Sequence, residues 1–99
     1  MRLTQAQVEA IRNSAKEVFG EGAKVWLFGS RVDDAKRGGD IDLLVRPTES
    51  HVSTPLISKM RFLNMLEASL GERKMDVVIV TPIDTRPIVR VAHETGVLL

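Results

Sequence analysis

The sequence predicts a small α/β protein of the α+β type, in which a mixed three-stranded sheet packs with helices. Two observations support this fold class. Apolar residues recur every three or four positions in three segments, as in amphipathic helices, and they form short runs in three others, as in buried strands. The predicted order along the chain is helix, strand, strand, helix, strand, helix.

The first part of the chain predicts a helix and a strand. Thr4 and Gln7 stand at the spacing of a capping box and open a segment with apolar residues at helical intervals. Gly20 and Gly22 end this helix. The unbroken apolar run of residues 25–28 then predicts a buried strand.

The middle of the chain predicts a second strand and a second helix. Residues 31–39 are mostly polar, with room for one helical turn, and residues 40–46 form an apolar strand closed by Pro47. Residues 56–70 again carry apolar side chains every three or four positions. Gly71 is placed as the C-terminal stop of this helix.

The last part of the chain predicts a strand, a helix and an apolar tail. Residues 75–80 read Met-Asp-Val-Val-Ile-Val, and β-branched residues favour strands. Pro82 ends this strand and Pro87 begins the last helix. Gly96 ends that helix before the apolar tail of residues 97–99.

The connections between the strands predict where they meet. A strand, helix and strand in succession normally form a right-handed crossover with parallel strands, so Asp40 and Asp76 begin their strands at the same edge. The short link after the first strand favours an antiparallel neighbour. That arrangement brings Gly29 and Ser30, at the end of the first strand, to the same edge.

Composition restricts the classes of function. A chain of 99 residues is short enough to predict one domain, residues 1–99. The net charge of +1 does not favour a nucleic acid partner. No apolar run approaches the roughly 20 residues of a membrane span, and the N-terminus does not resemble a signal peptide, so we expect a cytoplasmic protein with no membrane partner. Without cysteine, metal ligands must be oxygen or imidazole.

Three aspartates form the candidate metal site. Asp40 and Asp42 are separated by one residue on a strand, so both carboxylates point to one face while Ile41 points to the other. Adjacent carboxylates repel each other unless a cation lies between them, and such oxygen ligands suit Mg²⁺. Asp76 begins the neighbouring strand and can supply a third ligand.

A glycine-serine bend faces these aspartates. Gly29 and Ser30 follow a buried strand, so exposed backbone N–H groups and a small hydroxyl would face whatever the metal holds, which suits a triphosphate. A Cβ at Gly29 would obstruct the approach of phosphate oxygens. Arg31 either contacts phosphate or faces water.

The segment Leu27-Phe28-Gly29-Ser30-Arg31, followed after Gly39 by Asp40-Ile41-Asp42-Leu43-Leu44-Val45, resembles the signature of the minimal nucleotidyltransferase (MNT) family of the DNA polymerase beta superfamily. The resemblance implies the nucleotidyltransferase fold. It implies that Gly29 and Ser30 bind the β- and γ-phosphates of ATP or another nucleoside triphosphate. It also implies that Asp40, Asp42 and Asp76 hold two Mg²⁺ ions, and that Asp76 helps to deprotonate an acceptor hydroxyl.

The resemblance leaves more than one function open. Many small MNT proteins are antitoxins beside an all-helical HEPN toxin, so a hydroxyl of such a protein is one acceptor, with the partner or a homo-oligomer completing the site. A non-catalytic antitoxin that masks its partner by contact is the alternative from another class. Modification of a small molecule is a third hypothesis.

The candidate residues also have ordinary structural interpretations. Asp40 and Asp42 could cap backbone N–H groups, Asp76 could be a solvated strand end, and Gly29 with Ser30 could form a simple turn. Other charged groups are interpreted as surface residues rather than ligands: Asp33, Asp34, His51, Lys59, Arg61, Arg86, Arg90 and His93.

Overall fold

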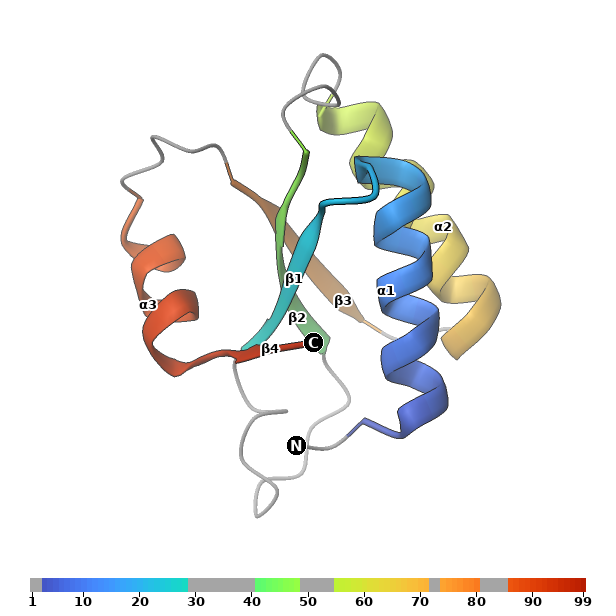
Figure 1. The fold of residues 1–99 in the computed structure, drawn as a ribbon, viewed down its shortest axis with the longest axis horizontal. Helices are drawn as coiled ribbons and strands as arrows, with labels where there is room; N and C mark the ends of the chain where they lie inside the picture. Colours follow the sequence, from blue (N-terminus) through green and yellow to red (C-terminus); the bar gives the residue numbers. More distant parts are fainter. Residues whose placement is uncertain (1–2, 29–40, 49–54, 72–73, 81–85) are drawn as a thin grey trace.

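The computed structural model describes residues 3–28, 41–48, 55–71, 74–80 and 86–99. Its elements (Figure 1) are α1 (Gln5–Phe19), β1 (Lys24–Phe28), β2 (Ile41–Arg46), α2 (Pro55–Leu70), β3 (Met75–Ile79), α3 (Pro87–Thr95) and β4 (Val97–Leu98). The first six confirm the predicted order of helices and strands. The helical turn predicted in residues 31–39 lies outside the described residues.

The sheet of the described residues has four strands, in the order β3-β2-β1-β4. β1 is antiparallel to β2 and β2 is parallel to β3, as predicted. The prediction of three strands was one strand short, because Val97 and Leu98 form β4, antiparallel to β1. A strand of two residues shows no recognisable periodicity, so the sequence predicts only an apolar tail there.

The predicted helix ends are confirmed. The Gln7 backbone N–H donates to the Thr4 hydroxyl oxygen at 3.1 Å, and the Thr4 N–H donates to the Gln7 side-chain oxygen at 2.9 Å, which completes the capping box of α1. α1 ends at Gly20, with φ of 106°, and α2 is followed by Gly71, with φ of 82°.

No helix among the described residues is both long and apolar enough to cross a bilayer.

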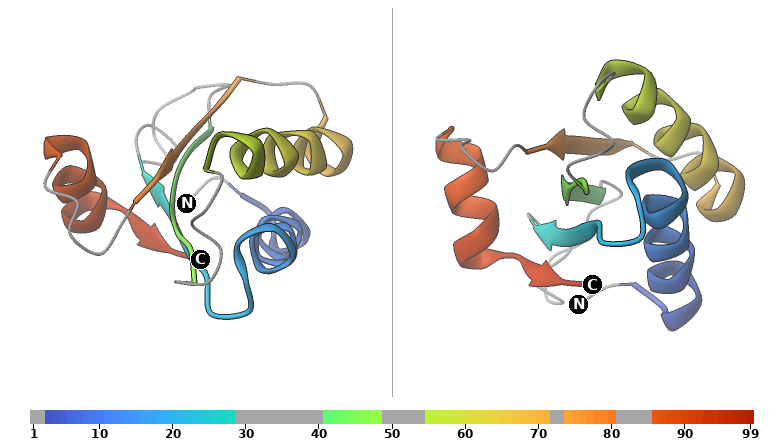
Figure 2. Two further views of the ribbon diagram at one scale, coloured as in Figure 1. Left: turned by 90° about the horizontal axis from the view of Figure 1, so that it is seen from above. Right: turned by 45° about the horizontal axis from the view of Figure 1, so that its top comes forward.

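The helices cover both faces of the sheet. α1 and α2 lie together on one face, whereas α3 lies on the other (Figure 2). On the α1/α2 face, the rings of Phe19 and Phe62 meet edge to face with centroids 5.3 Å apart. They belong to the main core, which also contains Ile11, Ala15, Val18, Val25, Leu27, Ile41, Leu43, Val45, Leu66, Leu70 and Val77.

A second, smaller core lies on the α3 face. It consists of Phe28, Leu44, Val80, Val89 and Ala92, with Trp26 and Val78 packed against it. β2 has a strand on each side and a core on each face, so Leu43 is buried in the main core and Leu44 in the second core. This double burial explains why β2 is an apolar run rather than an alternating pattern.

Gly96 joins α3 to β4 at a point where backbones approach closely. Its N–H donates to the Ala92 carbonyl oxygen at 2.8 Å. Its φ of −80° is available to any residue, so the requirement for glycine is one of space. A Cβ at this position would overlap the Ala92 carbonyl oxygen and would lie 3.0 Å from the Leu27 carbonyl oxygen.

We therefore expect Gly96→Ala to lower the free energy of unfolding by about 1–3 kcal/mol, measured by urea denaturation, because the backbone must shift to admit the methyl group. Gly22→Ala is the matched control. Its Cβ would lie 3.6 Å from the Thr48 hydroxyl oxygen, an ordinary contact, and should change stability by less than about 0.5 kcal/mol. Equal stability of the two variants would contradict the close approach at Gly96.

Candidate active site

Two of the predicted aspartates are direct neighbours on adjacent strands. Asp42 of β2 and Asp76 of β3 are register partners in the parallel pair. The register is fixed at the start of both strands, where the Ile41 N–H donates to the Lys74 carbonyl oxygen at 3.0 Å. Neighbouring strands are about 4.8 Å apart, so the two carboxylates leave the sheet side by side.

The two carboxylates lie on the α3 face of the sheet. Ile41 and Leu43 are buried in the main core, and Asp42 between them points to the opposite face, as the strand period predicts. Asp42 is half-buried and Asp76 is exposed. The pair therefore stands at the accessible edge of the sheet beyond the second core.

The end of β1 meets the start of β2 at this same edge. Phe28, the last residue of β1, is the register partner of Asp42. In the sequence Gly29 follows Phe28 directly, and Asp40 directly precedes Ile41. The predicted site residues Gly29, Ser30, Arg31 and Asp40 themselves lie outside the described residues.

The charges of the pair suit a divalent cation. Like charges directly opposite each other on neighbouring strands destabilise a sheet unless they are compensated. Carboxylate oxygens are hard ligands of the kind that Mg²⁺ prefers, and accessible carboxylates leave room for the water molecules that Mg²⁺ retains. The described residues contain no group of three or more His, Asp or Glu side chains that could hold a metal ion, so this pair is the described part of the predicted Mg²⁺ site.

Two further contacts of β3 were not evident from the sequence, one at its start beside the carboxylates and one at its opposite end. Lys74 holds the start of β2 against β3 through its backbone carbonyl oxygen, a group that any residue could supply. The Arg86 guanidinium donates to the Ile79 carbonyl oxygen at 2.8 Å, at the end of β3, so this arginine ties the start of α3 to the sheet. Arg90, in contrast, forms an exposed pair with Glu94 at 3.0 Å, which agrees with its interpretation as a surface residue.

Residues 8–99 match the family model described as "Nucleotidyltransferase domain". Because the match covers most of the chain, the protein belongs to this family, within the DNA polymerase beta superfamily, as the resemblance in its sequence implies. The family acts on nucleoside triphosphates and generally uses divalent metal ions. No curated protein matches the chain at a significant level.

Replacing Asp76 tests the electrostatics of the pair without an activity assay. In the absence of divalent cations, we expect Asp76→Asn to equal the parent protein or exceed it by up to about 1 kcal/mol in free energy of unfolding, because one of two adjacent charges is removed. Mg²⁺ should raise the melting temperature of the parent but not of the variant.

Thermal denaturation in EDTA and in Mg²⁺ measures both effects. Glu67→Gln, which neutralises an exposed carboxylate on α2, is the control and should keep the parent's response to Mg²⁺. An Asp76→Asn variant that Mg²⁺ stabilises as much as the parent would show that this carboxylate is not a metal ligand.

Proposed function

We propose that the protein is a Mg²⁺-dependent nucleotidyltransferase that transfers a nucleoside monophosphate, namely AMP from ATP, to an acceptor hydroxyl. The observation that carries this proposal is the register of Asp42 with Asp76, which sets two carboxylates side by side at the sheet edge where β1 ends. Membership of the nucleotidyltransferase family supplies the class of reaction.

The three aspartates have distinct roles in this proposal. Asp40 and Asp42 hold two Mg²⁺ ions, and Asp76 shares one of them. When bound, the ions stabilise negative charge on the attacking and the departing oxygen. The carboxylates fix the position of this charge, so most of the rate enhancement comes from placement and electrostatics.

The triphosphate is held by the segment that follows β1. Gly29 and Ser30 bind the β- and γ-phosphates through backbone N–H groups and the hydroxyl, and Arg31 adds a positive charge. The pairing of Phe28 with Asp42 supports this role, because β1 ends beside Asp42 and Gly29 follows Phe28 directly in the sequence.

The reaction is an in-line displacement. The acceptor oxygen forms a bond to the α-phosphorus, and the bond from that phosphorus to the oxygen bridging it to the β-phosphate breaks. Pyrophosphate leaves with the electron pair of the broken bond. The acceptor proton passes to the Asp76 carboxylate and then to water. Asp76 is exposed, so it is accessible to an acceptor approaching from solution.

The acceptor we favour is a hydroxyl of a protein partner, namely a HEPN-type helical toxin, with this chain as its antitoxin. The exposure of Asp76 supports a large acceptor, because an exposed carboxylate is accessible to a hydroxyl on the surface of another protein. A partner or a second copy of the chain would then complete the acceptor side.

Labelled nucleotide separates catalysis from binding. The protein is incubated with ATP labelled in the α-phosphate, Mg²⁺ and the product of the adjacent gene, and label on that product is counted. We expect transfer by the parent protein and a loss of at least about 100-fold in Asp42→Asn and Asp76→Asn, because each removes charge that positions the reacting groups. Glu67→Gln should retain the parent rate within about twofold.

Two outcomes would decide against this proposal. If no label is transferred and the aspartate variants still neutralise the partner, the protein is a non-catalytic antitoxin that acts by contact. If pyrophosphate is released only when a soluble small molecule is added, the acceptor is that molecule and not a protein.

A further inference from the structure

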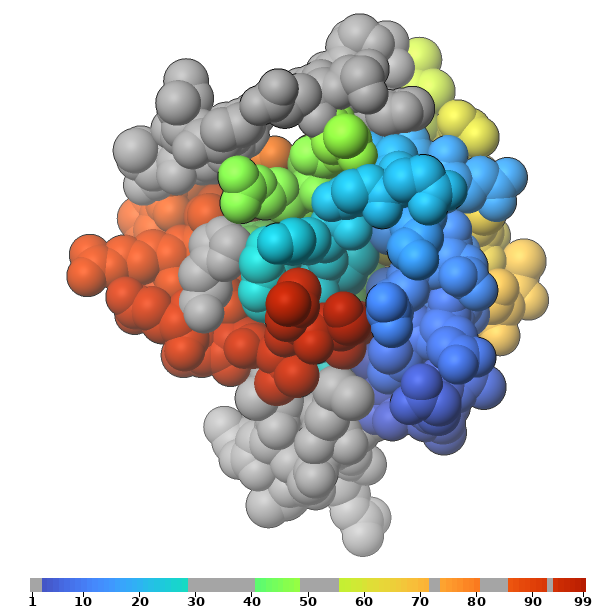
Figure 3. Space-filling view, viewed as in Figure 1, coloured from blue at the N-terminus to red at the C-terminus, as the bar shows by residue number. Residues whose placement is uncertain are grey.

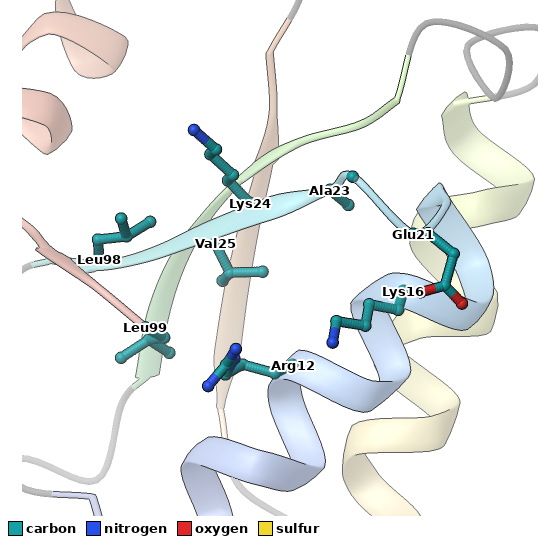
Figure 4. A pocket seen from close by; sticks show the side chains of 9 residues that line it. Arg12, Lys16, Glu21, Ala23, Lys24, Val25, Leu98 and Leu99 are labelled. Carbon is teal, nitrogen blue, oxygen red and sulfur yellow. The ribbon is translucent and has the colours of Figure 1, made fainter.

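A hollow of about 330 Å³ lies between α1, the turn that follows it, and the edge formed by β1 and β4 (Figure 4). Figure 3 shows α1, this turn and the C-terminal residues side by side on one surface of the molecule. Pockets for small molecules span about 300–1,000 Å³, so the hollow has room for a small organic compound.

The hollow is separate from the carboxylate pair. It opens beside Val25, which is buried on the α1/α2 face, whereas Asp42 points to the α3 face. Val25 pairs with Val45 and Phe28 pairs with Asp42, so the two places are also three residues apart along β1, about 10 Å. A ligand in the hollow would not contact the aspartates.

Two cations point into the hollow from consecutive turns of α1. Arg12 and Lys16 project toward Val25 and Leu99, while Lys24 points away from them (Figure 4). Neither Arg12 nor Lys16 makes an ion pair with another described residue. Like charges four residues apart destabilise a helix. Lys16 lies in the last turn of α1, where the helix dipole stabilises a positive charge. Arg12 lies one turn earlier, so the dipole does not account for its charge.

The remaining walls define the chemistry of a ligand. Leu99 is half-buried against the main core and offers apolar surface, whereas Val25 is buried and closes the inner end of the hollow. Glu21 and Lys24 also line the hollow, so its charged lining residues, Arg12, Lys16, Lys24 and Glu21, carry a net charge of +2. A compound that matches this environment has one anionic group and one apolar part.

We propose that the hollow binds a small organic anion. A phosphate or carboxylate group of the ligand contacts Arg12 and Lys16, and its apolar part lies against Leu99. This proposal does not depend on the proposed transferase activity, because it requires neither nucleoside triphosphate nor Mg²⁺.

Titration followed by the NMR shifts of backbone amides tests the proposal in the absence of Mg²⁺. The probes are phenyl phosphate, benzoate, benzyl alcohol and inorganic phosphate. We expect saturable shifts at Glu21, Gly22 and Ala23, with a dissociation constant of about 1 mM or lower for at least one of the two aromatic anions. Benzyl alcohol, which lacks the charge, and inorganic phosphate, which lacks the apolar part, should each bind at least about tenfold more weakly.

Paired variants test the residues. Arg12→Gln with Lys16→Gln should weaken binding of the aromatic anion by at least about tenfold. Lys59→Gln with Arg61→Gln is the matched control, because it also removes one half-buried lysine and one exposed arginine, from α2. Circular dichroism and melting temperature verify that both variants fold.

Three outcomes would overturn the proposal. One is the absence of saturable shifts for both aromatic anions. The second is an equal loss of affinity in the two paired variants, which would indicate a general effect of charge. The third is binding whose shifts concentrate at Asp42 and Asp76 instead of the turn. If none of these outcomes occurs, the dissociation constants of phenyl phosphate and benzoate identify which anionic group the hollow prefers.

Discussion

The parallel pairing of β2 with β3 is the constraint on which the site depends. A shift of one residue in this register would turn Asp42 into the main core and would carry Ile41 and Leu43 out of it. Burial of those apolar residues therefore fixes the register, and the register sets Asp42 beside Asp76. The hydrophobic effect that forms the core thus also places the two carboxylates side by side.

Local signals in the sequence predicted most of the fold. Thr4 and Gln7 define the start of α1, and Gly71 marks the end of α2, because capping depends on neighbouring residues alone. The two-residue strand β4 was missed since it has too few residues for a pattern. The close approach at Gly96 was also beyond prediction, because it involves the carbonyl oxygen of Leu27, which is distant in the sequence.

The part of the candidate site that depends on how the strands are connected could be predicted from the sequence. The crossover rule placed Asp40 and Asp76 at the same edge of the sheet. The structure confirms that Asp42, on the same strand as Asp40, is a neighbour of Asp76, whereas Asp40 itself lies outside the described residues. The parts assigned to Gly29, Ser30, Arg31 and Asp40 remain predictions. The hollow was not predicted, because Arg12 and Lys16 look like ordinary exposed helix residues until the C-terminal tail packs beside them. The net charge of +1 gave no indication that an acidic pair, Asp42 and Asp76, lies on one face of the sheet and a basic pair, Arg12 and Lys16, on the other.

The two edges of the sheet bear on how copies of the chain behave at high concentration. An unpaired strand edge is a template for joining other chains into extended aggregates. In the part of the sheet that the structure describes, β4 offers two residues at one edge, and β3 carries the exposed charge of Asp76 at the other. The acidic side chain that the transferase proposal assigns to chemistry therefore also discourages β3 from adding a strand of another molecule, so its neutralisation would favour self-association.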